Sequence, residues 1–449
     1  MPTRGIAIRH RVLGMLGLLS MITYLDRVCF GSVAPLIKTE FDLSDTQKGL
    51  LFGAFGLAYA AFEVPSGWLG DRFGPKRTLT RIVLWWSTFT VLTGLIWPTP
   101  AAPLLGFALL LAVRFLFGMG EAGAYPNIAR ALHNWLPFRE RGFGQGVIWM
   151  CGRLAGGLTP FLVVQLFVWF SHPGTSEVNW RPVFWIFGGL GAAWCLFFVR
   201  WFVDRPEDHA GISTEELQLI AGDRPPYAGD ERRVPWRAMI KSANLWSLCL
   251  MYFCSSYGWY FNITYLPGFL KERFHVDGHS LRYSLMAGAP LLVGSLACLL
   301  GGFLTDGLVR YSGNRKWGRR GAGVLGHGLC AGFYFLAAYA QSLELFVVAI
   351  TLAAFWNDLT MGSSWSVCQD IGGPHTGVVA GCMNTIGNLG GAAAGVITGI
   401  VLDVTKEPNS QDWNELGWHI NLLSFALVYV VAVIFWLRID AKEPIAPVA

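Results

Sequence analysis

The pattern of hydrophobic positions predicts a chain of long apolar helices. A helix that crosses a bilayer needs about 20 predominantly apolar residues, and runs of that kind recur along the whole sequence between short charged or turn-forming stretches. They lie at residues 11–37, 48–70, 78–97, 102–132, 142–170, 182–203, 244–270, 281–309, 321–341, 344–370, 376–402 and 416–438. The pattern therefore predicts an all-α membrane protein with twelve transmembrane helices.

The one long polar stretch lies near the middle of the chain. Residues 204–241 are rich in charged residues and proline and separate the sixth predicted helix from the seventh. We interpret them as a linker between an N-terminal six-helix half, residues 1–203, and a C-terminal six-helix half, residues 242–449.

An internal repeat supports this division. Gly67–Asp71 matches Gly302–Asp306 at an offset of 235 residues, and four glycines of the fifth helix match four of the eleventh at the same offset: Gly142, Gly146, Gly152 and Gly156 with Gly377, Gly381, Gly387 and Gly391. Two separate segments with one offset indicate a tandem duplication of a six-helix unit. Small residues four apart let helices approach closely, so the fifth and eleventh helices are predicted to form the contact between the halves.

Composition agrees with a membrane protein. The chain is 53% hydrophobic and only 14% charged, whereas a soluble protein carries roughly a quarter charged residues. A soluble enzyme is therefore excluded, and a net charge of +5 gives no reason to expect nucleic acid. The nine cysteines lie inside apolar runs without metal-ligand spacing, so we expect neither a metal site nor disulfides.

Basic residues crowd alternate loops, which predicts the orientation. They include Arg9 and Arg11, Arg72 to Arg81, Arg130 to Arg141, Arg310 to Arg320, and Arg438 with Lys442. By the positive-inside rule both termini are predicted to be cytoplasmic. The loop after the first helix is short and the glycosylation sequon Asn262–Thr264 lies within a helix, which favours a bacterial inner membrane.

A few ionisable residues fall at membrane depth: Asp26, Arg27, Glu63, Arg114, Glu121, Arg153 and Asp358. Such residues are costly in hydrocarbon and are functional candidates by default. Arg114 and Glu121 are two turns apart and share one helix face. Because the adjacent Asp26 and Arg27 point in different directions, we expect Asp26 to pair with Arg114, which leaves Arg27 free for an anionic ligand.

Arg153 stands at a position that is Asn388 in the second repeat. Two polar residues at equivalent positions suggest two walls of one central cavity. The alternative is that these charges are structural ion pairs that close the bundle, and for Glu63 and Asp358 the two interpretations stay equally open.

The sequence has a segment that matches a soluble-enzyme motif by its letters, but its structural context excludes that function. Gly118–Gly123 fits a dinucleotide-binding fingerprint by its letters but lies inside an apolar helix, where no strand-to-helix turn can form. The sequence contains no Walker A motif and no nucleophile elbow. We therefore predict that the protein is not an enzyme.

Gly67–Arg77, with its degenerate copy at Gly302–Asp306, resembles the signature loop of the major facilitator superfamily. Further segments resemble one branch, the anion:cation symporters: Tyr24–Arg27, Arg114–Ala122, Asp204–His209, Tyr265–Pro267 and Asn384–Gly391. The resemblance covers nearly the whole chain. It implies a secondary transporter that carries an organic anion, such as a sugar acid or dicarboxylate, together with protons by alternating access.

The resemblance also implies roles for individual residues. The substrate carboxylate is expected at Arg27, in a cavity lined by Tyr24, Tyr59, Arg153, Asn384 and Asn388. Asp26 and Glu121 match the proton-coupling acids, and Arg114 matches the partner that switches between them. The gating motif would comprise Gly67, Asp71, Arg72, Gly74 and Arg77.

The sequence departs from the family in the fifth helix. Where many bacterial sugar-acid carriers have a glutamine, this chain has Cys151 with Arg153 beside it. A second fixed positive charge favours dicarboxylates or phosphorylated compounds over simple monocarboxylates.

Two other functions stay open: exchange of phosphorylated compounds against phosphate, and a membrane sensor that does not transport. The absence of a mid-helix arginine in the second half argues against exchange, and the short segment after the last helix argues against a sensor.

Apart from protons as the coupling ion we expect no cofactor, and we expect a monomer whose partners are a small organic anion and the lipid bilayer.

Overall fold

The computed structural model describes residues 6–99, 102–171, 178–222, 233–276, 281–406 and 413–445. Each predicted span corresponds to one helix or to two consecutive helices, which confirms the predicted all-α fold of twelve membrane segments. The first half contains α1 (Ile8–Glu40), α2 (Asp45–Phe73), α3 (Pro75–Thr93), α4 (Pro103–Glu121), α5 (Ala124–Trp135), η1 (Phe138–Glu140), α6 (Arg141–Phe170) and α7 (Arg181–Trp201). There follow η2 (Pro206–Asp208), α8 (Thr214–Ala221), α9 (Trp236–Lys241), α10 (Ala243–Thr264), α11 (Leu266–Phe274), α12 (Leu281–Ser312), α13 (Arg315–Ala338), α14 (Leu343–Leu359), α15 (Met361–Gly372), η3 (Gly373–His375), α16 (Thr376–Thr405) and α17 (Glu415–Arg438).

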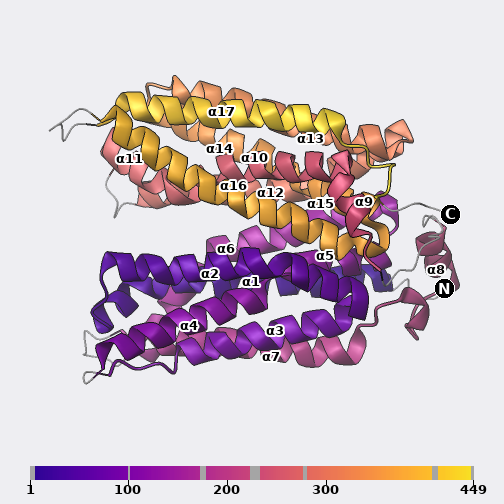
Figure 1. The fold of residues 1–449 in the computed structure, drawn as a ribbon, viewed down its shortest axis with the longest axis horizontal. Helices are drawn as coiled ribbons and strands as arrows, with labels where there is room; N and C mark the ends of the chain where they lie inside the picture. The colour runs from indigo at the N-terminus through magenta and orange to yellow at the C-terminus, as the bar shows by residue number, and fades with distance from the viewer. Residues whose placement is uncertain are drawn as a thin grey trace.

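The helices form two bundles, α1–α7 and α10–α17 (Figure 1). Both chain termini lie at one end of the molecule together with α8, at the right in Figure 1, and we call this end the termini end. Nine stretches of the described residues are long and apolar enough to cross a membrane, and one of them, Leu343–Thr405, holds two successive segments. The domain limits predicted above stay predictions, and residues 223–232 of the predicted linker lie outside the described residues.

Three of the predicted spans are interrupted by short breaks. The fourth breaks at Gly123, which has φ +86°, and a side chain there would collide with Ser66 of α2. Only glycine combines that conformation with so close a helix contact. The seventh breaks at Tyr265, two residues before Pro267, which lacks the N–H needed to continue the helix. The tenth breaks at Thr360, between α14 and α15.

The two halves meet through glycines that the repeat places equivalently. α6 packs on α12, and α16 packs on α2. A side chain at Gly146 would collide with the backbone of α12, and one at Gly381 would press on the backbone of α2. The fifth predicted helix, α6, therefore contacts α12 of the second half, and the eleventh, α16, contacts α2 of the first half.

Two carboxylates close the termini end by capping helices across the interface. Asp71 of α2 accepts hydrogen bonds from the backbone N–H groups of Gly377 and Val378 at the start of α16, at 2.9 and 2.8 Å. In the second repeat, Asp306 of α12 accepts from Gly142 and from the next residue of α6, at 3.0 and 2.6 Å. A carboxylate at a helix N-terminus binds unpaired N–H groups and the positive end of the helix dipole. The duplication has thus produced two equivalent caps.

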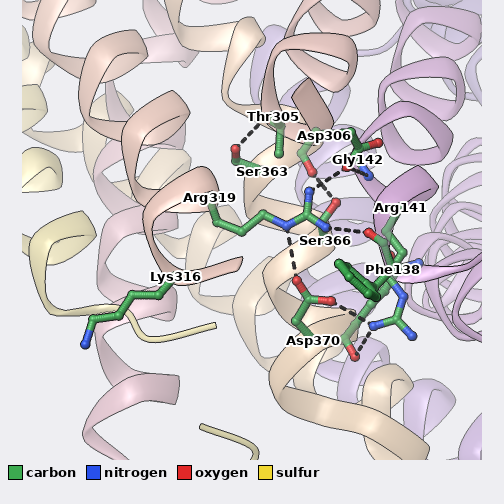
Figure 2. A network of polar contacts seen from close by, with 12 residues as sticks. Phe138, Arg141, Gly142, Thr305, Asp306, Lys316, Arg319, Ser363, Ser366 and Asp370 are labelled. Atoms are coloured by element: carbon green, nitrogen blue, oxygen red, sulfur yellow. Dashed lines mark hydrogen bonds and ion pairs between the residues drawn. The ribbon is translucent and has the colours of Figure 1, made fainter. Parts of the chain in front are cut away.

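A buried ion-pair network surrounds the second cap (Figure 2). Arg319 bonds Asp306 at 2.8 Å, Asp370 at 3.1 Å and the carbonyl oxygen of Phe138 at 3.0 Å. Arg141, from the first half, bonds the other oxygen of Asp370 at 2.8 Å. Although the sequence suggested that Arg141 and Arg319 were loop charges, both are buried and they hold the halves together.

The rest of the predicted gating motif lies beside the first cap. A side chain at Gly67 would collide with the carbonyl group of Gly377, so this glycine lets α2 and α16 touch. Gly74 has φ +88° and packs against Asp204, which accepts a hydrogen bond from the Lys76 N–H at 2.7 Å. Burial raises the pKa of the Asp204 carboxyl, and that hydrogen bond opposes the rise.

The two arginines of the motif, Arg72 and Arg77, are exposed. The Arg72 guanidinium lies 5.3 Å from the Trp68 ring centroid on its own helix. Neither arginine forms a hydrogen bond across the interface in the described part of the chain.

We predict that Asp71→Asn and Asp306→Asn each shift the protein toward a conformation that is open at the termini end. Loss of the charge weakens each cap by about 1 kcal/mol, roughly a fivefold shift, and the double variant should shift further. Paramagnetic labels at the exposed Phe73 and Tyr311, one in each half, measure the change as a longer label-to-label distance.

Asp440→Asn is the matched control for this experiment, because Asp440 pairs with Lys316 of its own half at 2.5 Å. It should leave the label-to-label distance unchanged. Unchanged distances in both cap variants would show that the caps do not hold this end closed.

Candidate functional site

The centre of the first half contains an ion pair between Arg27 and Glu121. The Nε and Nη2 atoms of Arg27 on α1 donate to one oxygen of Glu121 on α4 at 3.1 and 2.9 Å. The Arg27 side chain is 28% exposed, whereas that of Glu121 is fully buried. The second Glu121 oxygen has no hydrogen-bond partner among the described residues. The pair therefore has a cation that a ligand can reach and a buried acid whose hydrogen bonds come from Arg27.

The predicted pair of Asp26 with Arg114 is not present among the ion pairs of the described residues. Asp26 instead accepts a hydrogen bond from the Trp86 indole at 3.0 Å. The Arg114 guanidinium lies 4.0 Å from the centroid of Phe30 and near two further phenylalanine rings of α2 and α4. The prediction failed because Arg27, and not Arg114, pairs with a carboxylate of this cluster, that of Glu121. Aromatic faces are the alternative partner for the buried Arg114 guanidinium.

A second ion pair joins the two halves. Arg153 of α6 donates through Nε and Nη2 to the two oxygens of Asp358 on α14, at 3.1 and 3.0 Å. Asn357 donates to Asp358 at 3.1 Å. The Asp358 side chain is fully buried and that of Arg153 is 5% exposed. The sequence gave both residues as candidates without pairing them, because nothing in it places α6 beside α14.

Tyr24 lies between these two arginines. Its hydroxyl accepts a hydrogen bond from Nη1 of Arg153 at 3.2 Å, and the Arg27 guanidinium lies 5.7 Å from its ring centroid. Gly152 and Gly156 leave room for the Tyr24 ring, because a side chain at either would touch it. The predicted cavity residues Tyr24, Arg27 and Arg153 are thus brought together in one place.

A third polar cluster connects α2 with α16. Glu63 accepts hydrogen bonds from the amide groups of Asn384 and Asn388, the second at 3.4 Å. Tyr59, one turn before Glu63, has its ring centroid 4.7 Å from the Arg27 guanidinium. The two asparagines predicted to line the cavity therefore contact an acid of the opposite half, and their role toward a substrate stays a prediction.

The equivalence between Arg153 and Asn388 extends to these contacts. Each lies on the glycine-lined helix of its half, and each binds an acid of the other half, Asp358 or Glu63. α6 and α16 therefore each contribute a polar residue to the interface between the halves. That the two residues form two walls of one cavity stays a prediction.

The arrangement can bind and release anions. It offers two guanidinium groups, each neutralised by one carboxylate, in a membrane-spanning bundle where an uncompensated charge is costly. An anionic ligand can replace a carboxylate only when that carboxylate becomes neutral or moves away. Among the described residues, no group of three or more His, Cys, Asp or Glu side chains is placed to hold a metal ion.

Comparison with known proteins adds independent information. Residues 16–395 match the family model described as Major Facilitator Superfamily. The chain is 34% identical to the probable sulfoacetate transporter SauU of Cupriavidus necator over 88% of both proteins. It is 26% identical to the probable galactarate/D-glucarate transporter GudP of Escherichia coli, over 89% of this chain and 88% of that one.

A solved structure supports the fold. The proton:xylose symporter XylE, bound to 6-bromo-6-deoxy-D-glucose, superposes with a TM-score of 0.75 and covers 97% of this chain and 98% of its own. The identity is 12%, so the similarity concerns the architecture alone.

The buried ion pair of Arg153 with Asp358 leads to a prediction about the free energy of unfolding of single and double variants. Asp358→Asn leaves the Arg153 charge buried without a counterion and should lower the free energy of unfolding by about 3–5 kcal/mol. The double variant Arg153→Gln/Asp358→Asn has a neutral pair and should unfold close to the wild-type temperature. Thermal unfolding of the purified protein in detergent measures both, and a double variant less stable than the single one would contradict the prediction.

Proposed function

This chain belongs to the Major Facilitator Superfamily, and on that premise we propose that it is a proton-coupled symporter of a small organic anion that works by alternating access. As a multi-pass membrane transporter it falls among carriers of organic anions and sugar acids, to which the relatives above belong. Proton coupling, alternating access and the assignment of individual residues are our proposal.

The ion pair of Arg27 with Glu121 carries the proposal. Arg27 is the part-exposed cation at the centre of the first half, and its guanidinium is occupied by a buried acid. A carboxylate ligand bound at Arg27 competes with Glu121 for the same N–H groups. Protonation of Glu121 removes its charge and frees the guanidinium, so proton and anion bind together.

Charge compensation explains why both ligands must cross together. With the proton and the anion bound, Glu121 is neutral and Arg27 is paired with the substrate, so the centre carries no net uncompensated charge from this pair. With the anion alone, the centre gains one negative charge, which is costly at membrane depth. The loaded and the empty transporter can therefore change conformation, whereas the half-loaded one is disfavoured.

The closed termini end supports a direction for this cycle. The caps made by Asp71 and Asp306, together with Arg141 and Arg319, join the halves there. With the termini in the cytoplasm of a bacterial cell, as the loop charges predict, this is a state closed toward the cytoplasm. Opening of these contacts would give the inward-facing state, and we propose that one chain completes the cycle as a monomer.

We predict that Arg27→Lys abolishes binding although the positive charge is kept. A planar guanidinium holds a carboxylate by two parallel hydrogen bonds, which an ammonium cannot do, and the expected loss of affinity exceeds tenfold. A thermal-shift series with sulfoacetate, D-glucarate and D-gluconate measures binding. Arg200→Lys, at an exposed site on α7, is the control, and wild-type affinity in Arg27→Lys would remove Arg27 from the site.

We predict that Glu121→Gln separates binding from coupling. The amide mimics the protonated acid, so Arg27 is always available and the variant should exchange labelled for unlabelled substrate across proteoliposomes at the wild-type rate. It should no longer accumulate the monoanion D-gluconate when the outside is acidified, because position 121 can no longer take up a proton with the anion.

Glu344→Gln is the matched control, since Glu344 pairs with Arg282 where both side chains are exposed. It should keep acid-driven accumulation. Acid-driven accumulation of D-gluconate retained in Glu121→Gln would move the coupling role to another acid, and loss of exchange together with accumulation would assign Glu121 to binding.

A further inference from the structure

We infer that Asp358 is a second proton-coupling acid, which releases Arg153 to the second anionic group of a doubly charged substrate. This inference rests on the proposed symport and deepens it: the substrate is a compact dianion, and two protons accompany each molecule. The first proton goes to Glu121, as proposed above, and the second goes to Asp358.

The first observation is that both arginines beside Tyr24 are occupied in the same way. Arg27 is paired with Glu121 at 2.9 Å and Arg153 with Asp358 at 3.0 Å. Each acid is completely buried, whereas each arginine keeps some exposure. A ligand that takes both guanidiniums must therefore displace two carboxylates, and each displaced carboxylate would be left buried without a counterion.

The surroundings of Asp358 favour its neutral form once Arg153 is taken away. The titratable groups that interact with it from the helices packed around it are Cys298 of α12, Cys330 and Tyr334 of α13, Tyr429 of α17, and Arg153 of α6, and His327 of α13 bonds the neighbouring Thr360. From α10, Ser255 donates a hydrogen bond to Asn357 rather than to Asp358. Among these groups Arg153 is the cation that balances the Asp358 charge. A buried carboxylate that loses its counterion takes up a proton.

The packing also leaves room for a proton-bearing Asp358. Gly294 of α12 lies directly against one Asp358 oxygen, where any larger residue would collide with it. Asn357 remains within 3.1 Å of the other oxygen, so its amide can stay bonded to the neutral acid. Protonation therefore breaks the bond to Arg153, while one Asp358 oxygen keeps its hydrogen bond from Asn357.

The geometry at Tyr24 gives the substrate class. One tyrosine contacts both guanidiniums, by its hydroxyl and by its ring, so a short molecule with an anionic group at each end can reach both at once. The Trp259 ring lies 4.1 Å from the Arg153 guanidinium and shields that end from water. A carboxylate or sulfonate group fits such a bidentate arginine.

The charges balance in this scheme. Two protons enter with a dianion, so the complex that crosses the membrane gains no net charge. The ion pairs Arg27–Glu121 and Arg153–Asp358 are replaced by two arginine–substrate pairs and two neutral acids. On release, each acid loses its proton and takes back its arginine, which expels the substrate.

The experiment measures how strongly a proton gradient drives accumulation in proteoliposomes. Sulfoacetate and D-glucarate serve as dianions, and D-gluconate serves as the monoanion that matches D-glucarate in length. Each coupled proton contributes a factor of about 10 per pH unit, so the wild type should accumulate a dianion about 100-fold per pH unit. Because transport is electroneutral, an imposed membrane potential should not change that ratio.

The variant Arg153→Gln/Asp358→Asn removes the second pair without leaving a buried charge. It should prefer D-gluconate to the dianions and accumulate it about 10-fold per pH unit. Glu344→Gln, on the same helix as Asp358 and exposed, is the control and should behave as the wild type.

The outcomes separate this inference from the proposed function. Absence of any acid-driven accumulation in the wild type would overturn the symport itself. Wild-type accumulation of a dianion near 10-fold per pH unit, or a double variant that keeps the 100-fold ratio and the preference for dianions, would overturn the role of Asp358 and leave symport through Glu121 intact.

Discussion

The two halves of this protein depend on carboxylates that cap the N-termini of helices in the opposite half. Asp71 holds α16 and Asp306 holds α6, and the same two helices carry Asn388 and Arg153 toward the centre. A cap of this kind contributes only about 0.5–2 kcal/mol. Each cap therefore contributes only a small free energy to the closed termini end. A change of comparable size in the central ion pairs, transmitted along the rigid helices α6 and α16, is enough to alter the balance between conformations.

The buried charges at the centre are better explained by switching than by stability. Removal of two charges from water costs several kcal/mol per ion, and well-packed apolar residues are often as stable as a buried pair. Arg27–Glu121 and Arg153–Asp358 share a feature that pure stability does not require: each joins two different helices and leaves the arginine closer to solvent than the acid. Such pairs exchange one partner for another at little net cost, which is a property that a carrier needs.

Hydropathy, the central polar stretch and the 235-residue repeat were sufficient to predict the helices and the equivalence of the halves. The equivalence extends to single contacts, since Asp71 and Asp306 cap residues that the repeat aligns. The pairing of the charges was beyond sequence reasoning. Which acid pairs with Arg27 depends on how α1 is rotated against α4. The contact between Arg153 and Asp358, which are 205 residues apart in the sequence, depends on how the two halves are placed relative to each other. Arg141 and Arg319 looked like loop charges because burial at a helix end has no signature in the sequence.

Tyr24 has a consequence for the length of any molecule held by both arginines. Its ring lies against Gly152 and Gly156, so the approach of α1 to α6 fixes where the ring can lie, and the ring in turn separates the two guanidinium groups. The spacing is therefore a property of backbone packing and not of flexible side chains. A protein with an alanine at either glycine would hold its two cations further apart. Chain-length selectivity in such carriers can thus evolve through small residues that never touch the transported molecule.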